Sequence, residues 1–316
     1  MEETKELFSK KRNIYKNEDA GMAFLLANTL PLLAMFIFVF AISFAGVNIE
    51  KVETELWYLI IAALISQLAF LIVVIFINKV NKISFSALKI KFKLNWKTLL
   101  ICVAISIVCF LSLYNFIEVF DFAFESMGYK AQGAVLPLDN AGYLVLNLIL
   151  LAVLPAIMEE IVFRGVVLNG LRSKYGDVVS VLMAAGLFAI MHASLSQLVY
   201  PFIMGIIFGV LVLRTGNLLC SIIVHFLNNT IVVVMQYVEI HTGFSFAMTM
   251  NWWTILLAIL IAAVGMLILF LLDKFVFKHK TKEEMIVERD MTQKRSVFMI
   301  AGIVICVIMF VLNLVI

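Results

Sequence analysis

The sequence predicts an all-α, polytopic integral membrane protein with about nine transmembrane helices and a polar site inside the membrane. Hydrophobic residues make up 64% of the 316 residues, whereas charged residues make up only 14%. This composition is typical of membrane proteins rather than of soluble globules. Three of the apolar segments between residues 142 and 237 nevertheless contain Glu, Arg or His side chains. Because charges are costly in a bilayer, these segments point to a functional site.

Nine apolar segments, close to the roughly 20 residues that a helix needs to cross a bilayer, define the expected spans. In chain order they are residues 22–44, 57–77, 98–120, 142–168, 178–192, 198–213, 218–237, 252–275 and 297–316. The segment 1–21 carries Lys5, Lys10, Lys11, Arg12 and Lys16 and precedes an apolar segment too long for a signal peptide, so we expect a retained cytoplasmic tail. Short turns at Tyr175-Gly176 and Thr215-Gly216 make their flanking helices antiparallel neighbours, with Asp177 as an expected N-cap.

The charges of the connections predict the orientation of the chain in the membrane. One connection is crowded with lysines and the connection before it with glutamates. Basic connections stay in the cytoplasm, so this asymmetry puts the N-terminus inside and, with nine spans, the C-terminus outside. The basic residues are Lys79, Lys82, Lys89, Lys91, Lys93 and Lys97, and the acidic residues are Glu50, Glu53 and Glu55.

The fourth segment contains Glu159, Glu160 and Arg164. Three charged residues this close together in an apolar segment need partners from the protein or from water. Glu160 and Arg164 are four residues apart and can pair on one face of a helix, whereas Glu159 points about 100° away. We therefore expect the two carboxylates to have different roles. Pro155 removes a backbone hydrogen bond one turn before them.

Two further segments contain His192 and the pair His225/Asn229. At 1.5 Å rise per residue, Glu159 and His192 both lie roughly 20 Å from the turn that joins their helices. His225 and Asn229 lie at about 12 and 18 Å from the next turn, so all four side chains can meet in one layer. Asn228 can take the place of Asn229, because it lies on nearly the same helical face.

The ordered set Glu159-Glu160-x-x-x-Arg164, Phe188-x-x-x-His192 and His225-x-x-x-Asn229 resembles the signature of the CPBP intramembrane proteases. This family, also called Abi, includes type II CAAX prenyl endopeptidases and bacteriocin-processing or immunity proteins. The resemblance implies an intramembrane endopeptidase of a bacterial cell membrane. It also implies that Glu159 and His192 activate water, while His225 and Asn229 stabilise the oxyanion.

A general base and hydrogen-bond donors are what amide hydrolysis needs, so we favour a site without a cofactor. The residues also allow a zinc ion or another divalent metal, held by Glu159, His192 and His225. The expected partners are a membrane-associated peptide or protein substrate and the lipid bilayer. The basic segment 79–97, with its interleaved aromatic residues, is more typical of a membrane surface than of nucleic-acid binding.

Two functions from other classes use similar residues. Buried Glu, His and Arg also occur in proton-coupled transporters, although the chain shows no repeated half of the kind that many transporters contain. A non-catalytic immunity protein could bind a peptide with the same groups. The expected organisation is a cytoplasmic tail (1–21), a transmembrane scaffold (22–141), a catalytic core (142–240) and C-terminal transmembrane helices (241–316).

Overall fold

The computed structural model describes residues 12–129, 136–195, 197–245, 247–249, 251–276, 290 and 292–315. These residues form helices and connections, with no named strand in the described part of the chain. Six helices are long and apolar enough to cross a membrane. They are α2 (Asn17–Phe44), α4 (Leu56–Val80), α5 (Trp96–Ser126), the continuous helix Ala141–Arg172, α11 (Leu218–Thr242) and α12 (Trp252–Val276). The predicted all-helical membrane fold is thereby confirmed.

Three shorter apolar helices coincide with the other three expected spans. They are α9 (Asp177–Met191), α10 (Val199–Thr215) and α13 (Val297–Val315). By length and composition, six of the nine expected spans meet the requirement for crossing a bilayer among the described residues. One predicted boundary is wrong: the N-cap of α9 is Gly176, and Asp177 is the first helical residue. Its carboxylate accepts a hydrogen bond from Arg172 Nε at 2.8 Å instead of capping its own helix.

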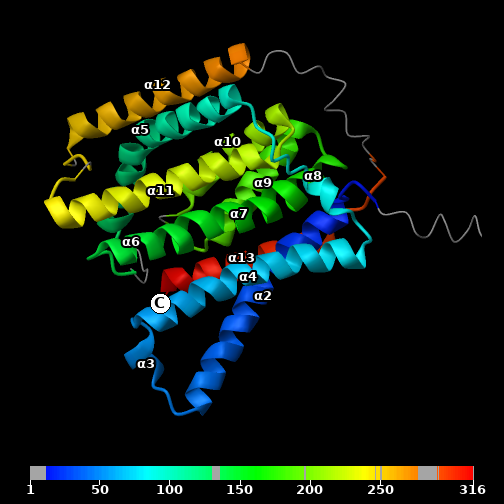
Figure 1. Ribbon diagram of the computed structural model, residues 1–316, viewed down its shortest axis with the longest axis horizontal. Helices are drawn as coiled ribbons and strands as arrows, with labels where there is room; N and C mark the ends of the chain where they lie inside the picture. The colour runs from blue at the N-terminus through cyan, green and yellow to red at the C-terminus, as the bar shows by residue number, and fades with distance from the viewer. Residues whose placement is uncertain are drawn as a thin grey trace, which may run out of the picture.

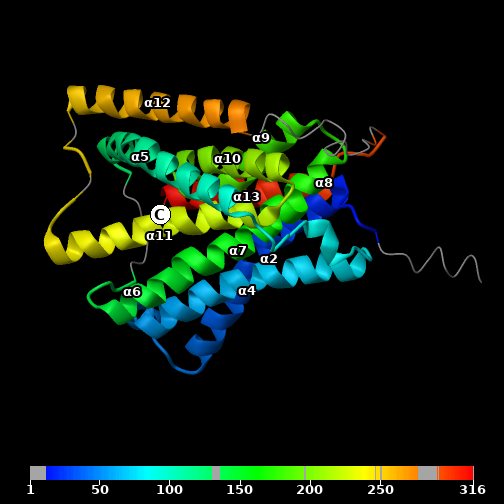
Figure 2. The same cartoon turned by 45° about the horizontal axis from the view of Figure 1, so that its top comes forward.

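The helices pack in layers around a central pair (Figures 1 and 2). The helix Ala141–Arg172 lies against α11 at the centre of the bundle. On one side it meets α2 and α4, and α13 packs against α2. On the other side α11 packs against α5, which in turn contacts α12. The two scaffold regions of the sequence thus enclose the segment that carries the polar residues.

Small residues bring α9 and α10 into close contact. A Cβ atom on Gly205 would lie 2.9 Å from Cα and Cβ of Ala185, and one on Gly209 would lie 3.1 Å from Val181. Gly205 and Gly209 are four residues apart, and small residues at this spacing let two helices approach closely.

The connections that the charge pattern assigns to the cytoplasm lie together at one end of the bundle, which we call the basic end. Polar contacts join chain segments that are far apart in the sequence. They link Asn17 to Gln293, Ser173 to Asp290, Lys91 to Asn217, and Arg214 to Asp273. The opposite end is joined in the same way, by bonds from Tyr129 to Ser194, His241 to Asp139, and Asn313 to Ala193.

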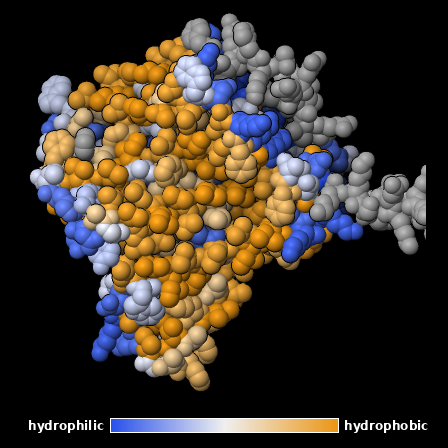
Figure 3. All heavy atoms as spheres, viewed as in Figure 1, coloured by the Kyte–Doolittle hydropathy of each residue, from blue (hydrophilic) through white to orange (hydrophobic). Residues whose placement is uncertain are grey.

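The surface between the two ends is apolar. Figure 3 shows a broad hydrophobic area across the middle of the face in view, with hydrophilic residues gathered toward its edges. Exposed side chains such as Phe36, Phe40, Leu256 and Leu260 are each between 59% and 67% accessible. In water such an apolar surface would drive aggregation, whereas it suits contact with lipid.

Candidate active site

The helix that carries the two glutamates changes its winding on both sides of them. It runs from α6 (Ala141–Asn147) through the π-helical η2 (Leu148–Val153) into α7 (Leu154–Glu160). A second π-helical segment, η3 (Ile161–Leu168), and the short α8 (Asn169–Arg172) complete it. π-Helical segments are rare and frequently occur at functional sites. Their presence here is not evident from the sequence.

Pro155 lies at the start of α7, where it has no N–H to offer to the carbonyl of Leu151 one turn earlier. In the structure the side chain of Asn229 donates from Nδ2 to that carbonyl over 2.9 Å. The expected loss of a backbone bond at Pro155 is therefore compensated by a side chain from α11. This bond ties α11 to the helix that carries Glu159 and Glu160.

Glu160 is completely buried at the centre of the site. Its Oε1 accepts hydrogen bonds from Arg164 Nη1 at 2.6 Å and from His225 Nδ1 at 3.2 Å. The guanidinium of Arg164 lies between two aromatic rings, 4.4 Å from the centroid of Phe188 and 5.0 Å from that of Phe208. The Glu160–Arg164 pair that the spacing predicts is present, and its environment holds both side chains in place.

His225 lies between the two glutamates. A carboxylate can only accept hydrogen bonds, so the contact with ionised Glu160 makes Nδ1 of His225 the donor. The other ring nitrogen, Nε2, lies 3.9 Å from Oε2 of Glu159. The ring of Phe208 stacks on the imidazole at a centroid distance of 5.0 Å. His225 is thus oriented by Glu160 on one side and presents Nε2 to Glu159 on the other.

His192 caps the C-terminus of α9. Its Nδ1 lies 2.8 Å from the backbone carbonyl oxygen of Phe188, which can only accept, so Nδ1 carries the proton. The neutral ring therefore presents an unprotonated Nε2 that can accept a proton. The Phe188 ring meets the His192 ring edge-on at 4.9 Å. Phe188 and His192, four residues apart in the sequence, therefore pack against one another at the end of α9.

Glu159 and His192 line one cavity of about 260 Å³. The remaining lining comes mostly from helices outside the segment with the polar motifs. It includes Asn28, Pro31 and Leu32 of α2, Ser66 and Phe70 of α4, and Ile305, Cys306 and Met309 of α13. The sequence predicts transmembrane helices in these regions, and no motif in them indicates a cavity wall. Among them, Asn28 and Cys306 are in contact, with Sγ to Oδ1 at 3.0 Å.

The structure brings five of the six predicted site residues together. Glu159 shares a cavity with His192 and faces His225, and the neighbouring Glu160 pairs with Arg164. The sixth residue, Asn229, has a different environment. The amide of Asn229 is half-buried and bonded to Leu151, and it does not line the cavity. Asn228, the alternative, is buried and donates to the carbonyl of Val224 in its own helix. In the described part of the chain, no group of three or more His, Cys, Asp or Glu side chains is arranged to hold a metal ion.

Comparison with known proteins gives two matches. Residues 141–231 match the family model described as "Type II CAAX prenyl endopeptidase Rce1-like". A stretch of 110 residues is 31% identical to the Bacillus subtilis (strain 168) protein named "Putative membrane peptidase YdiL". This match covers 35% of the present chain and 45% of the relative, so the chain spans less than half the length of that relative. No solved structure gives a significant match.

The matched region coincides with the helices that carry the polar cluster. It begins with α6 and ends two residues after Asn229, so it contains every motif on which the resemblance to the CPBP proteases rests. The helices that complete the cavity, α2, α4 and α13, lie outside it. The expected resemblance is thereby confirmed for this region: residues 141–231 are similar to the Rce1-like type II CAAX prenyl endopeptidase family.

Proposed function

We propose that the chain is an intramembrane endopeptidase that hydrolyses a peptide bond in a membrane-associated protein or peptide. The observation that carries this proposal is the shared cavity of Glu159 and His192, next to a second carboxylate, Glu160, whose Oε1 is ion-paired with Arg164. The match of the central helices to an endopeptidase family and the name of the relative support it.

In this proposal Glu159 and Nε2 of His192 take up the proton of a water molecule in the cavity. The resulting hydroxide attacks the carbonyl carbon of the scissile peptide bond, and the carbonyl oxygen becomes the oxyanion of a tetrahedral intermediate. Collapse of the intermediate breaks the C–N bond, and the proton passes to the leaving amine. The hydrogen bond from Nδ1 of His192 to the carbonyl of Phe188 leaves Nε2 free to accept the proton.

The oxyanion needs hydrogen-bond donors placed near it. A protonated His225 ring donates from Nδ1 to Glu160 and retains a second N–H, at Nε2, on the side of Glu159. Asn229 uses one hydrogen of its amide for Leu151 and has a second available. We propose that His225 and Asn229 donate hydrogen bonds to the oxyanion. Arg164 acts indirectly, because its ion pair with Glu160 holds that carboxylate in position beside His225.

The same proposal includes a cytoplasmic N-terminus, nine spans and an external C-terminus. The connections rich in Lys and Arg meet at the basic end, which is the arrangement that the positive-inside rule requires of cytoplasmic connections. With this orientation Glu159 lies inside the bilayer, and its substrate is a peptide segment that lies in or at the membrane.

The experiment that tests the proposal compares membrane-associated peptides from cells that produce the wild-type chain, Glu159→Gln or Glu118→Gln. The control, Glu118, is another glutamate within an apolar helix, on α5, and it does not line the cavity. We expect peptides that depend on the wild-type chain to be absent with Glu159→Gln and present with Glu118→Gln. Identical peptide sets from all three cell lines would refute the proposed activity.

A further inference from the structure

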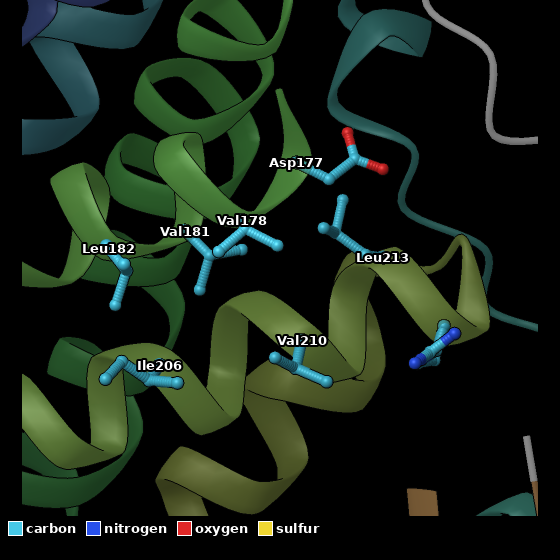
Figure 4. A pocket seen from close by; sticks show the side chains of 8 residues that line it. Asp177, Val178, Val181, Leu182, Ile206, Val210 and Leu213 are labelled. Atoms are coloured by element: carbon cyan, nitrogen blue, oxygen red, sulfur yellow. The ribbon is translucent and has the colours of Figure 1, made fainter. Parts of the chain in front are cut away.

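A second cavity, of about 250 Å³, lies at the basic end between α9 and α10 (Figure 4). Its walls are aliphatic: Val178, Val181 and Leu182 come from α9, and Ile206, Val210 and Leu213 come from α10. Figure 4 shows the two sets of side chains facing one another across the gap between the helices, with Asp177 beyond one end of the row. Val178 and Leu182 are 73% and 46% exposed, so the groove opens to the outside of the bundle.

The charged rim of this groove carries an excess of positive charge. Both nearby carboxylates are already paired: Asp177 with Arg172 at 2.8 Å, and Asp273 with Arg214 at 2.7 Å. Arg214 itself lines the groove and is 39% exposed. Its Nε and Nη2 are engaged with Asp273, so the N–H groups on Nη1 are available to another acceptor.

Lys89 adds a cation that has no ion-pair partner among the described residues. Its backbone carbonyl accepts from Leu218 N at 3.1 Å, so the residue is fixed beside the turn that follows Arg214. Burial, followed by the charges of Arg172 and Lys91, lowers the pKa of the Lys89 ammonium, while Asp177 opposes this effect. Among the described residues no carboxylate lies within ion-pair distance of Lys89. An added anion would therefore be stabilised here.

We infer that this groove binds an anionic phospholipid, with an acyl chain between α9 and α10 and the phosphate at Arg214 and Lys89. An aliphatic slot next to a basic rim is complementary to an amphiphile with a negative headgroup. The groove lies at the end that the charge pattern assigns to the cytoplasm, where anionic lipid headgroups attract clustered Lys and Arg. The inference does not depend on the proteolytic activity, since none of these residues lines the cavity with Glu159.

The test uses the full-length chain, purified in detergent, stripped of lipid, and titrated with phosphatidylglycerol or with phosphatidylcholine of the same acyl chains. Native mass spectrometry counts bound lipids, and the melting temperature reports stabilisation. We expect one phosphatidylglycerol to bind more tightly than phosphatidylcholine. Lys89→Gln should weaken it about five-fold, because one surface cation contributes on the order of 1 kcal/mol to anionic-lipid binding.

Two matched controls separate the groove from the surface in general. Val210→Trp fills the groove and should abolish the bound lipid, whereas Leu256→Trp, at a 59% exposed position of α12, should leave it unchanged. Lys97→Gln removes a charge from the same basic segment, at a residue whose ammonium lies over Trp96, and should have little effect. Equal binding of the two lipids, or full retention of phosphatidylglycerol by Val210→Trp, would overturn the inference. If Val210→Trp does not fold, the decisive comparison is between Lys89→Gln and the wild type. Equal affinities of these two proteins for phosphatidylglycerol would overturn the inference.

Discussion

The side chain of Asn229 donates a hydrogen bond of 2.9 Å to the backbone carbonyl of Leu151, on the helix that carries the two glutamates. Pro155, four residues later in the chain, has no N–H to donate to this carbonyl. The bond therefore joins α11 to the α6–α8 helix at a carbonyl that receives no hydrogen bond from the residue four positions later. Because His225 lies one turn before Asn229, the same bond sets the distance between its imidazole and the glutamates.

We predict that Asn229→Ala lowers the melting temperature, because it leaves the Leu151 carbonyl without this partner, at a cost on the order of 1 kcal/mol. The effect should be smaller in a Pro155→Ala background, where residue 155 regains an N–H for that carbonyl. A double-mutant cycle of melting temperatures measures this coupling. Strictly additive effects of the two substitutions would show that the proline and the amide are independent. Asn228→Ala, whose amide bonds only within α11, should show no coupling to Pro155.

The two adjacent glutamates should respond differently to loss of charge. Glu159→Gln should reduce turnover of a cleaved peptide at least about 100-fold while the melting temperature stays unchanged, because the side chain lines a cavity and its contact with His225 Nε2 is long, at 3.9 Å. Glu160→Gln should reduce both the peptide turnover and the melting temperature, because it removes the charged partner of Arg164 and His225. Activity and melting temperature measured on the same purified samples check this. Equal thermal destabilisation by both variants would contradict the division of roles.

Arg164→Ala should destabilise the fold by about 3–5 kcal/mol, because it leaves Glu160 charged and buried without its closest partner. The matched control is Arg214→Ala in lipid-free detergent, where the half-exposed pair with Asp273 contributes about 1 kcal/mol or less. Denaturant titrations of the three proteins give the comparison. If Arg164→Ala unfolded at the wild-type denaturant midpoint and only its peptide turnover were lower, the result would indicate that the arginine acts on the substrate rather than on the fold.

The cavity that contains Glu159 should be accessible to small membrane-permeant reagents. In a background without the four native cysteines, which are all buried, Met309→Cys should react with such a reagent and be protected by substrate. Leu312→Cys, 46% exposed on the same helix, should react without protection. An impermeant reagent applied at the external face should not reach position 309. Labelling of Met309→Cys from that face would contradict this prediction, because it would show that the cavity is reached from the external side.

The proposed mechanism uses no metal ion, so strong chelators should leave peptide turnover unchanged. A zinc ion bound by an imidazole pair and a carboxylate would be retained through purification and removed by chelators, with loss of activity. Elemental analysis of the purified protein, together with turnover before and after chelation, distinguishes the two cases. Stoichiometric zinc, and recovery of activity on adding it back, would make Glu159 a ligand or a base beside the metal.

The sequence by itself determined the all-helical membrane fold, the segment that carries the polar residues and the pairing of Glu160 with Arg164. These properties depend on hydropathy and on the fixed geometry of a single helix, which places residues i and i+4 side by side. The common depth of Glu159 and His192 followed in the same way, since two short turns fix how the neighbouring helices are aligned.

Only the tertiary structure decided what surrounds these residues. The π-helical segments around α7, the bond from Asn229 to Leu151 and the cavity wall from α2, α4 and α13 all depend on how helices distant in the sequence pack. Apolar residues that face lipid and apolar residues that face a cavity have the same composition, so no local pattern separates them. The packing of α9 against α10 likewise determined that their aliphatic side chains form a groove beneath Arg214, next to the basic connection that contains Lys89.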